Sequence, residues 1–395
     1  MVALRQRYQK TKFGHIPVDW EIKRLKDIGT SIIGLTYKPE ETVEEGGTLV
    51  LRSSNIRNGR LVFDDNVYVK KCIPQKLFLK KGDLLICSRN GSKKLIGKNA
   101  LVREDTKYTF GAFMSVFRSK YSDYLYQLFQ TEMFNKQVAT NLGATINQIT
   151  TKDINAFQFP FPKEEKEQKK IVSILSTWDK AIESKEKLID HKKQQKKGLM
   201  QKLLTGEVRL PGYSGEWKKV KLGEILKERK ETGYTELELL AITSSKGVVK
   251  RTEVDIKDNS SEDKSKYKRI LPNDIGYNTM RMWQGVSGVS KYEGIVSPAY
   301  TILKPTNKVN SNFIGYLFKL PKIINLFRRY SQGLVSDTLN LKYENLKGIK
   351  VTIPQDVEEQ KKIAEILLSI DNEIEMLQEY VNYLKQQKKG LMQLL

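Results

Sequence analysis

Residues 193–201 read KQQKKGLMQ, and the same nine residues return unchanged at positions 385–393. The segment EQKKI at 167–171 also returns at 359–363, again 192 positions later. The two copies align without a gap from the first landmark to the second. An exact match at a fixed offset indicates an internal repeat, so the chain is predicted to contain one structural unit twice.

Each half also begins with a similar segment, in which a Trp, a Leu and an Ile keep their spacing. These residues are Trp20, Leu25 and Ile28 in the first half, and Trp217, Leu222 and Ile225 in the second. Between this opening segment and the EQKKI segment, the halves share only a loose pattern of short β-type runs with Gly and Asn turns, interrupted by an occasional helix. We therefore predict an α+β protein with two mixed α/β modules of like fold and different surface.

A long helix is predicted to close each half, over residues 164–204 and 356–395, because both stretches lack Pro and are rich in helix-forming residues. Apolar residues recur there in steps of three and four, the heptad pattern of helices that pair. Lysines at 185, 192, 196 and 388 interrupt the pattern. The residues predicted to pair are Ile171, Leu175, Trp178, Ile182, Ile189, Leu199 and Leu203 in the first helix, and Ile363, Leu367, Ile370, Ile374, Leu377, Val381, Leu384 and Leu391 in the second.

We expect these helices to form an antiparallel coiled coil, as two halves related by a pseudo-two-fold axis would. The alternative is that each helix packs only on its own module. A helix of 40 residues is about 60 Å long, so paired helices would separate the modules by at most roughly 18 base pairs of DNA. The predicted organisation is a module at 1–162, a helix at 163–206, a module at 207–354 and a helix at 355–395.

One glycine interrupts each predicted helix, Gly198 in the first and Gly390 in the second. Both lie inside the repeated nine-residue segment. Either this segment is a close-packed or partner-facing patch, or the duplication is recent and has not yet diverged. The sequence leaves both interpretations open.

The chain is strongly basic, since 69 Lys and Arg against 46 Asp and Glu give a formal net charge of +23. Such an excess predicts a polyanionic partner, because clustered Lys and Arg neutralise phosphates and release their counterions. A membrane is the weaker alternative, since there is no run of 18 apolar residues and no signal-peptide core. Two cysteines and two histidines are too few for the usual zinc site, and we expect reduced thiols and a cytoplasmic location.

The layout as a whole resembles the specificity subunits of type I restriction–modification systems. The segments that carry the resemblance are GHIPVDW (14–20), LRSSNIRNGRL (51–61), GYSGEW (212–217), GVVKRTEVDIKDNSSEDKSKYKRILPNDIGYNTMRMWQG (247–285) and both EQKKI helices that end in KKGLMQ. It covers essentially the whole chain. One departure is that the second helix stops at Leu395, without the Thr-Gly that follows Leu204 in the first, which leaves a trimmed C-terminus open.

The resemblance implies that each module is a target recognition domain, which reads one half of a split sequence in double-stranded DNA. The helices would set the gap and dock two methyltransferase (modification) subunits, and motor–nuclease (restriction) subunits would complete the enzyme. No cofactor is expected in this chain, whereas S-adenosylmethionine, ATP and Mg²⁺ would act in the partner subunits.

Catalytic motifs are missing from the sequence. No Asn-Pro or Asp-Pro pair occurs, so the loop with which an amino-methyltransferase holds its flipped base is absent. There is no GxxxxGK[ST] phosphate loop either. No catalytic residue and no metal ligand is therefore predicted. The alternatives kept open are a stand-alone DNA-modifying enzyme and a non-specific basic DNA-binding coiled-coil protein.

The candidate DNA-binding residues are polar side chains in loops that follow predicted strands and contain or border Gly, where base edges are commonly read. In the first module they are Ser53, Asn55, Arg57, Asn58, Arg89, Asn90, Ser92, Lys93, Lys94, Thr145, Asn147 and Gln148. In the second they are Ser244, Ser245, Lys246, Arg281, Trp283, Gln284, Ser331, Gln332, Ser336 and Thr338. Each could instead be an ordinary polar turn, and Trp283 could stack on DNA or belong to the core.

Basic side chains near these loops are candidates for phosphate contacts, which fix the position of a protein on DNA without reading its sequence. Solvation alone is the alternative for each of them. They are Lys70, Lys71, Lys93, Lys94, Lys246, Lys250, Arg251, Lys264 and Lys268.

Overall fold

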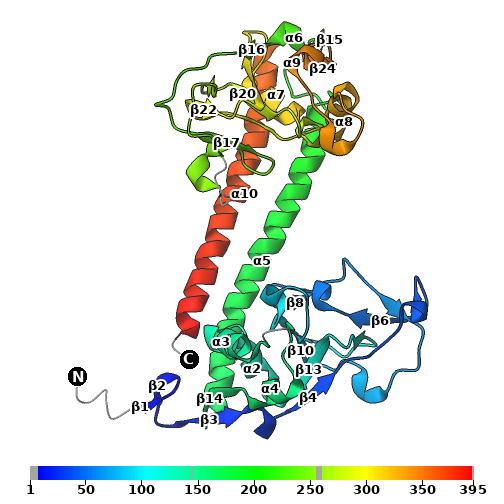
Figure 1. Ribbon diagram of the computed structural model, residues 1–395, viewed down its shortest axis with the longest axis vertical. Helices are drawn as coiled ribbons and strands as arrows, with labels where there is room; N and C mark the ends of the chain where they lie inside the picture. The colour runs from blue at the N-terminus through cyan, green and yellow to red at the C-terminus, as the bar shows by residue number, and fades with distance from the viewer. Residues whose placement is uncertain (1–7, 144–145, 255–259, 394–395) are drawn as a thin grey trace. The chain divides into compact units, whose positions relative to one another are not determined.

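The computed structural model describes residues 8–143, 146–254 and 260–393 (Figure 1). The chain divides into two compact units, of which unit 1 comprises Met1–Lys185 and Tyr380–Leu395, and unit 2 comprises Glu186–Glu379. Two long helices, α5 (Glu165–Leu203) and α10 (Val357–Met392), each contribute one segment to either unit. Among the residues described, no helix is long and apolar enough to cross a membrane.

Unit 1 is built from two four-stranded sheets, with strand orders β11-β10-β13-β4 and β12-β6-β9-β5, and three strand pairs. Its helices are α2 (Ser122–Leu128), α3 (Glu132–Asn141) and α4 (Thr151–Ala156). Its strands are β1 (Tyr8–Thr11), β2 (Gly14–Pro17), β3 (Trp20–Arg24), β4 (Thr30–Ile33), β5 (Thr42–Val43), β6 (Thr48–Leu51), β7 (Ile56–Arg57), β8 (Arg60–Leu61), β9 (Tyr68–Val69), β10 (Leu84–Cys87), β11 (Asn99–Leu101), β12 (Thr109–Phe110), β13 (Met114–Arg118) and β14 (Gln158–Pro162).

Unit 2 is built around one four-stranded sheet, with strand order β16-β23-β20-β21, and three strand pairs. Its helices are α6 (Leu222–Ile225), α7 (Ser311–Leu317), α8 (Pro321–Tyr330) and α9 (Tyr343–Leu346). Its strands are β15 (Trp217–Lys221), β16 (Leu226–Arg229), β17 (Leu240–Thr243), β18 (Gly247–Lys250), β19 (Lys268–Ile270), β20 (Ile275–Asn278), β21 (Ser287–Val289), β22 (Gly294–Val296), β23 (Tyr300–Pro305) and β24 (Lys350–Pro354). The α+β class is confirmed, with two sheet-containing units and two long helices.

The repeated sequence has a repeated structural role at the start of each long helix. In unit 1, β3 pairs with β14, and the indole Nε1 of Trp20 donates a hydrogen bond to Glu167 Oε1 at 3.0 Å. In unit 2, β15 pairs with β24, and Trp217 Nε1 donates to Glu359 Oε1 at 3.4 Å. The glutamine that follows each glutamate donates to the last proline carbonyl of the preceding strand. Corresponding Trp, Pro and Glu-Gln residues therefore join the entry strand to the helix in both units, and Pro precedes Glu by five positions in each.

Lysines in the apolar stripes pair with acids of the other helix. In unit 1, Lys388 Nζ in α10 lies 2.7 Å from Asp179 Oδ1 in α5. In unit 2, Lys196 Nζ in α5 lies 2.6 Å from Asp371 Oδ1 in α10. Both pairs join an early part of one helix to a late part of the other, so the two helices run antiparallel (Figure 1). Because each pair is the other displaced by the repeat, the contact is reciprocal, as in an isologous interface.

The heptad residues of the long helices also pack against the cores of the two units. Helix pairing and packing on a module, the two alternatives that the sequence left open, therefore both occur. Ile171 packs against the core of unit 1. Leu199, Leu203, Ile363 and Leu367 belong to or pack against the core of unit 2.

The repeated glycines do not serve close packing. A Cβ built on Gly198 or Gly390 meets no atom within 4 Å among the described parts of the chain. The close-packed interpretation of the KQQKKGLMQ segment is therefore not supported. The partner-facing interpretation and the recent duplication stay open.

Candidate nucleic-acid interface

Three segments of unit 1 that are far apart in the sequence meet where the buried strand β10 ends. Asn90 Nδ2 donates to Ser53 Oγ at 3.0 Å, and the Asn90 backbone N–H donates to the carbonyl of Asn147 at 3.2 Å. Arg89 and Gln148 form an isolated antiparallel bridge. We call Ser53, Arg89, Asn90, Asn147 and Gln148 the unit 1 cluster. Five residues predicted from the sequence are thus brought together.

A hollow of about 790 Å³ lies beside this cluster and is lined by Ser53, Arg89 and Asn90, together with Arg52 and Phe113. The Arg89 guanidinium lies 5.0 Å from the ring centroid of Phe113, and this ring is 57% exposed. Arg52 pairs with Asp65 at 2.9 Å, but its buried Nε has no hydrogen-bond partner in the described structure.

Arg52 and Phe113 are not among the DNA-binding residues predicted from the sequence. Arg52 follows the buried strand β6 almost as Arg89 follows β10, so the same pattern of strand and then Arg could have found it. Phe113 had no such signal, because an aromatic residue between two strands is usually part of a core.

The other candidates of unit 1 lie beside this cluster or outside it, and the Ser92 backbone N–H donates to Asn90 Oδ1 at 3.0 Å. Ser92, Lys93 and Lys94 are exposed at the short 3-10 turn η5 (Lys93–Leu95). Arg57 and Asn58 belong to the β7–β8 hairpin, whose Arg60 donates to the Asp179 carbonyl in α5 at 3.3 Å. Thr145 lies outside the described residues.

The structure corrects the prediction that Asn55 binds DNA. Its side chain is fully buried, its Oδ1 accepts from the Arg52 backbone at 2.9 Å, and its Nδ2 donates to the carbonyls of Val62 and Asp65. A buried amide whose donors and acceptor are satisfied inside the protein is not available to a base edge. Asn55 therefore has a structural role, as the residue that holds the loop after β6.

In unit 2 the corresponding loops meet at the end of β20. Leu341 N donates to the Thr279 carbonyl at 2.9 Å, and Gln332 and Asn340 exchange backbone hydrogen bonds. Arg281 Nη1 lies 3.9 Å from Asp337 Oδ1, and both side chains are largely exposed. The segment with Arg281, Trp283 and Gln284 therefore adjoins the loop with Ser331, Gln332, Ser336 and Thr338. We call these seven residues the unit 2 cluster.

A half-buried lysine supports the end of the first of these two segments. Lys319 Nζ donates to the carbonyls of Gly285 and Ser287, each at 2.7 Å. Burial lowers the pKa of Lys319 to about 8, and the nearby Lys196 contributes to the decrease. The local sequence does not predict this role, because Lys319 lies in the turn between α7 and α8 and its two carbonyl partners are more than 30 positions away.

Trp283 is less free than its loop position suggested. Its Nε1 donates to the Met280 carbonyl at 3.0 Å, and the Arg328 guanidinium lies 6.0 Å from its ring centroid. The side chain is partly buried. The indole is therefore fixed by its own loop, with a cation over the ring, and supports this loop.

Ser244, Ser245 and Lys246 form the exposed turn between β17 and β18. The Lys246 backbone N–H donates to Thr243 Oγ1 at 3.0 Å, which fixes this turn.

Several predicted phosphate contacts are occupied by internal partners. Lys71 pairs with Glu41 at 2.9 Å and Lys250 with Glu238 at 2.9 Å. Lys268 Nζ donates to the Tyr300 carbonyl, and burial lowers its pKa. Arg251 and Lys264 also have internal partners. The exposed ones are Lys70, Lys93, Lys94 and Lys246.

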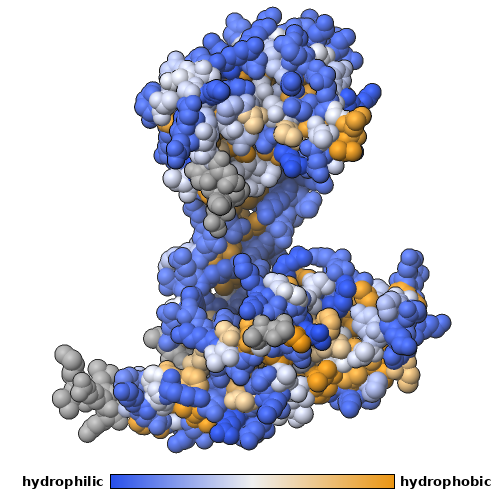
Figure 2. Space-filling model, viewed as in Figure 1, coloured by the Kyte–Doolittle hydropathy of each residue, from blue (hydrophilic) through white to orange (hydrophobic). Residues whose placement is uncertain are grey.

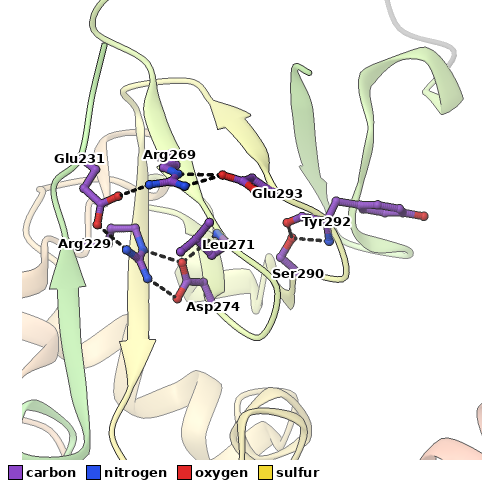
Figure 3. Close-up of polar contacts among 8 residues, drawn as sticks. All are labelled: Arg229, Glu231, Arg269, Leu271, Asp274, Ser290, Tyr292 and Glu293. Atoms are coloured by element: carbon purple, nitrogen blue, oxygen red, sulfur yellow. Dashed lines mark hydrogen bonds and ion pairs between the residues drawn. The ribbon is translucent and has the colours of Figure 1, made fainter. Parts of the chain in front are cut away.

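An acidic residue precedes the central strand of each unit, and its role is structural. In unit 2, Asp274 accepts from Arg229 Nε at 2.7 Å and from the Leu271 backbone at 2.9 Å, while Arg269 joins Glu231 to Glu293 (Figure 3). In unit 1, Asp83 accepts from Arg118 and from the Lys80 backbone. These networks fix the strands at whose far ends the clusters lie. Among the described residues, no group of three His, Cys, Asp or Glu side chains could hold a metal ion.

Comparison with known proteins places both units in one family. The family model described as type I restriction modification DNA specificity domain matches the chain twice, at residues 17–191 and 214–386. A putative type I restriction enzyme MjaX specificity subunit of Methanocaldococcus jannaschii is 27% identical, over 99% of this chain and 96% of that protein. The type I restriction enzyme EcoKI specificity subunit of Escherichia coli K12 is 27% identical, over 49% of this chain and 44% of that protein.

Two solved structures have the same fold. The S subunit of a type I restriction–modification system from M. genitalium superposes with a TM-score of 0.59 at 15% identity, over 95% of both chains. A chain from a structure titled for complex assembly and conformational transition of the type I R-M system gives a TM-score of 0.53 at 17% identity, over 95% of this chain and 97% of that one.

Proposed function

Because the chain belongs to the family of type I restriction modification DNA specificity domains, we propose that it is the DNA-recognition subunit of a type I restriction–modification enzyme. Each unit would read one half of a split target in double-stranded DNA. The observation that carries the proposal is that two units of one chain gather polar side chains from distant segments at corresponding strand ends. Such side chains are those that read base edges in the major groove.

Charge supports the same partner. The formal net charge is +23. Lys93 and Lys94 are exposed in η5, shortly after Asn90 of the unit 1 cluster, and Lys246 is exposed in the turn between β17 and β18 of unit 2. Lysines of this kind bind phosphates and position a protein on DNA, while the neighbouring Asn, Gln, Ser and Arg side chains discriminate between bases.

We further propose that the chain is not itself an enzyme and that the chemistry belongs to its partners. Two methyltransferase subunits would dock on α5 and α10, and motor–nuclease subunits would join them, with S-adenosylmethionine, ATP and Mg²⁺ acting in those subunits. The paired helices would set the gap between the half-sites. The complex would work in the cytoplasm, where the two unpaired thiols, Cys72 and Cys87, stay reduced.

The test is co-expression with a candidate methyltransferase from the same genome, followed by mass determination of the complex and sequencing of methylated genomic DNA. We expect two methyltransferases for each copy of this chain, and one methylated motif made of two defined halves around a fixed gap. Methylation by the chain alone would support a stand-alone enzyme. A chain that remains alone and binds DNA without preference would support the non-specific alternative.

A further inference from the structure

The loops that follow α3 and α8 occupy the same place in the two units. Both helices have ten residues. After α3, the Ile149 backbone N–H donates to the Ser88 carbonyl at 2.9 Å, and after α8, Leu341 donates to the Thr279 carbonyl at 2.9 Å. The loop after α8 therefore reaches the strand end that carries the unit 2 cluster, and the described residues 146–149 after α3 adjoin the strand end that carries the unit 1 cluster.

Each loop presents aliphatic side chains to solvent. Ile146 is 52% exposed in unit 1, and Leu334 and Val335 are 101% and 60% exposed in unit 2. On the face drawn in Figure 2 the surface is mostly hydrophilic, and an apolar protrusion lies at the edge of unit 2 beside α8. Single exposed aliphatic residues are common, and Ile33 is one of them. What distinguishes Ile146, Leu334 and Val335 is that each lies beside residues of a polar cluster, Asn147 in unit 1 and Ser336 in unit 2.

Hydrogen bonds hold the tip of the unit 2 loop in place. Thr338 Oγ1 donates to the Val335 carbonyl at 3.0 Å and accepts from the Val335 backbone N–H at 3.3 Å. Backbone hydrogen bonds between Gln332 and Asn340 close the base of the loop. The loop thus holds Leu334 and Val335 outward, next to Ser336 and Thr338 of the unit 2 cluster.

An aliphatic side chain makes no hydrogen bond to a base edge. In the major groove its distinctive partner is the C5-methyl group of thymine, which no other base carries. The neighbouring residues, Asn147 and Gln148 in unit 1 and Ser336 in unit 2, are of the types that read adjacent base edges by hydrogen bonds. Loop tips that combine both kinds of side chain are suited to A·T base pairs flanked by other specified pairs.

Insertion of these side chains between base pairs is a different use of apolar residues on DNA. Leu and Ile are among the side chains used in this way. The hydrogen-bonding residues beside these tips favour contact in the groove, because base edges are read there without unstacking. Insertion would unstack the bases, so a probe of stacking separates the two uses.

We infer that Ile146 in unit 1 and Leu334 with Val335 in unit 2 recognise thymine methyl groups, one set in each half of the target. This inference rests on the proposed function and assigns to the two loops a part of its sequence selectivity. It predicts that both half-sites contain a thymine whose methyl group, and not only its hydrogen-bonding edge, is read.

The experiment uses the complex with methyltransferase and the methylated motif defined by sequencing. Each thymine of the motif is replaced in turn by deoxyuridine, which removes the methyl group alone, and affinity is measured at fixed salt. For the wild-type complex, one replacement in each half should weaken binding about fourfold, the factor for one buried methyl-sized group. Ile146→Ala should abolish this difference in one half only, and Leu334→Ala with Val335→Ala in the other half only.

Ile33→Ala is the matched control, since Ile33 is an isoleucine of unit 1 that is 57% exposed on β4. It should leave the response to deoxyuridine unchanged. A half-site without thymine, or a wild-type complex indifferent to deoxyuridine, would overturn the inference. So would fluorescence of 2-aminopurine next to the motif that rises on binding and depends on Leu334, because this signal reports unstacking. If the wild-type complex methylates no split motif at all, it is the proposed function that fails.

Discussion

At the scale of single residues, the structure separates side chains that face solvent from those already engaged. Lys94 is exposed beside the unit 1 cluster, whereas Lys71 pairs with Glu41. The sequence predicted a phosphate contact for both lysines. It could not distinguish them, because burial and ion pairing depend on residues far away in the chain. For the same reason it could not exclude Asn55, whose partners lie up to 11 positions further on.

Lys94→Ala is expected to weaken binding of the complex to all DNA sequences alike, since a phosphate contact carries no base preference. The slope of log K against log salt should fall by about one counterion. Equilibrium binding between low and moderate salt measures both quantities. Lys71→Ala serves as the control and should leave the slope unchanged. A change in the methylated motif would show that Lys94 reads a base.

The lowered pKa of Lys319 makes the free energy of unfolding depend on pH in the alkaline range. Its pKa in the folded chain is about 8, below the ordinary 10.5 that applies after unfolding. Between these two pH values the unfolded chain binds the additional proton, so this group makes the folded chain more stable as pH rises. Urea unfolding of wild type and Lys319→Met from pH 7 to pH 10 should show the difference moving in favour of wild type. A difference that is constant with pH would contradict the assignment.

At the scale of elements, the sequence identified both long helices and the residues of their stripes, because a repeat of heptads is a strong local signal. None of the fifteen stripe residues is fully exposed. What the sequence could not show is that Lys388 and Lys196 interrupt the stripes in order to pair with Asp179 and Asp371. These contacts depend on the register between two distant segments, which no single stretch encodes.

Asp179→Ala should destabilise unit 1 strongly, because the Lys388 side chain is only 9% exposed and would lose its counter-charge. Removing one member of such a buried pair costs about 3–5 kcal/mol of unfolding free energy. Replacing both members, Asp179→Leu with Lys388→Leu, should recover part of this loss. Urea titration of wild type, Asp179→Leu, Lys388→Leu and the double variant gives the coupling between the two sites.

Lys169→Ala provides the matched control on the same helix. Lys169 and Glu165 form a pair with side chains 75% and 72% exposed, and exposed pairs contribute less than about 1 kcal/mol. If Asp179→Ala costs no more than Lys169→Ala, the Asp179–Lys388 pair does not hold the helices in register.

At the scale of the whole molecule, the repeat in the sequence was sufficient to predict two modules of like fold, and the family match confirms two specificity domains. The positions of the clusters could be predicted in outline, since loops after buried strands met as expected. The aliphatic tips Ile146, Leu334 and Val335 could not, because exposed aliphatic residues in a sequence look like core. The target itself is not written in the chain in any residue-to-base code.

The central claim is that one chain carries two independent readers of DNA, and Arg281→Ala tests it most directly. Arg281 is exposed at the unit 2 cluster, where its side chain makes a long contact with Asp337. The measurement is sequencing of genomic DNA methylated by complexes that contain wild type or Arg281→Ala. We expect one half of the split motif to become degenerate at one position, while the other half and the gap stay unchanged. Equal loss of preference in both halves would show that the two units do not read DNA independently.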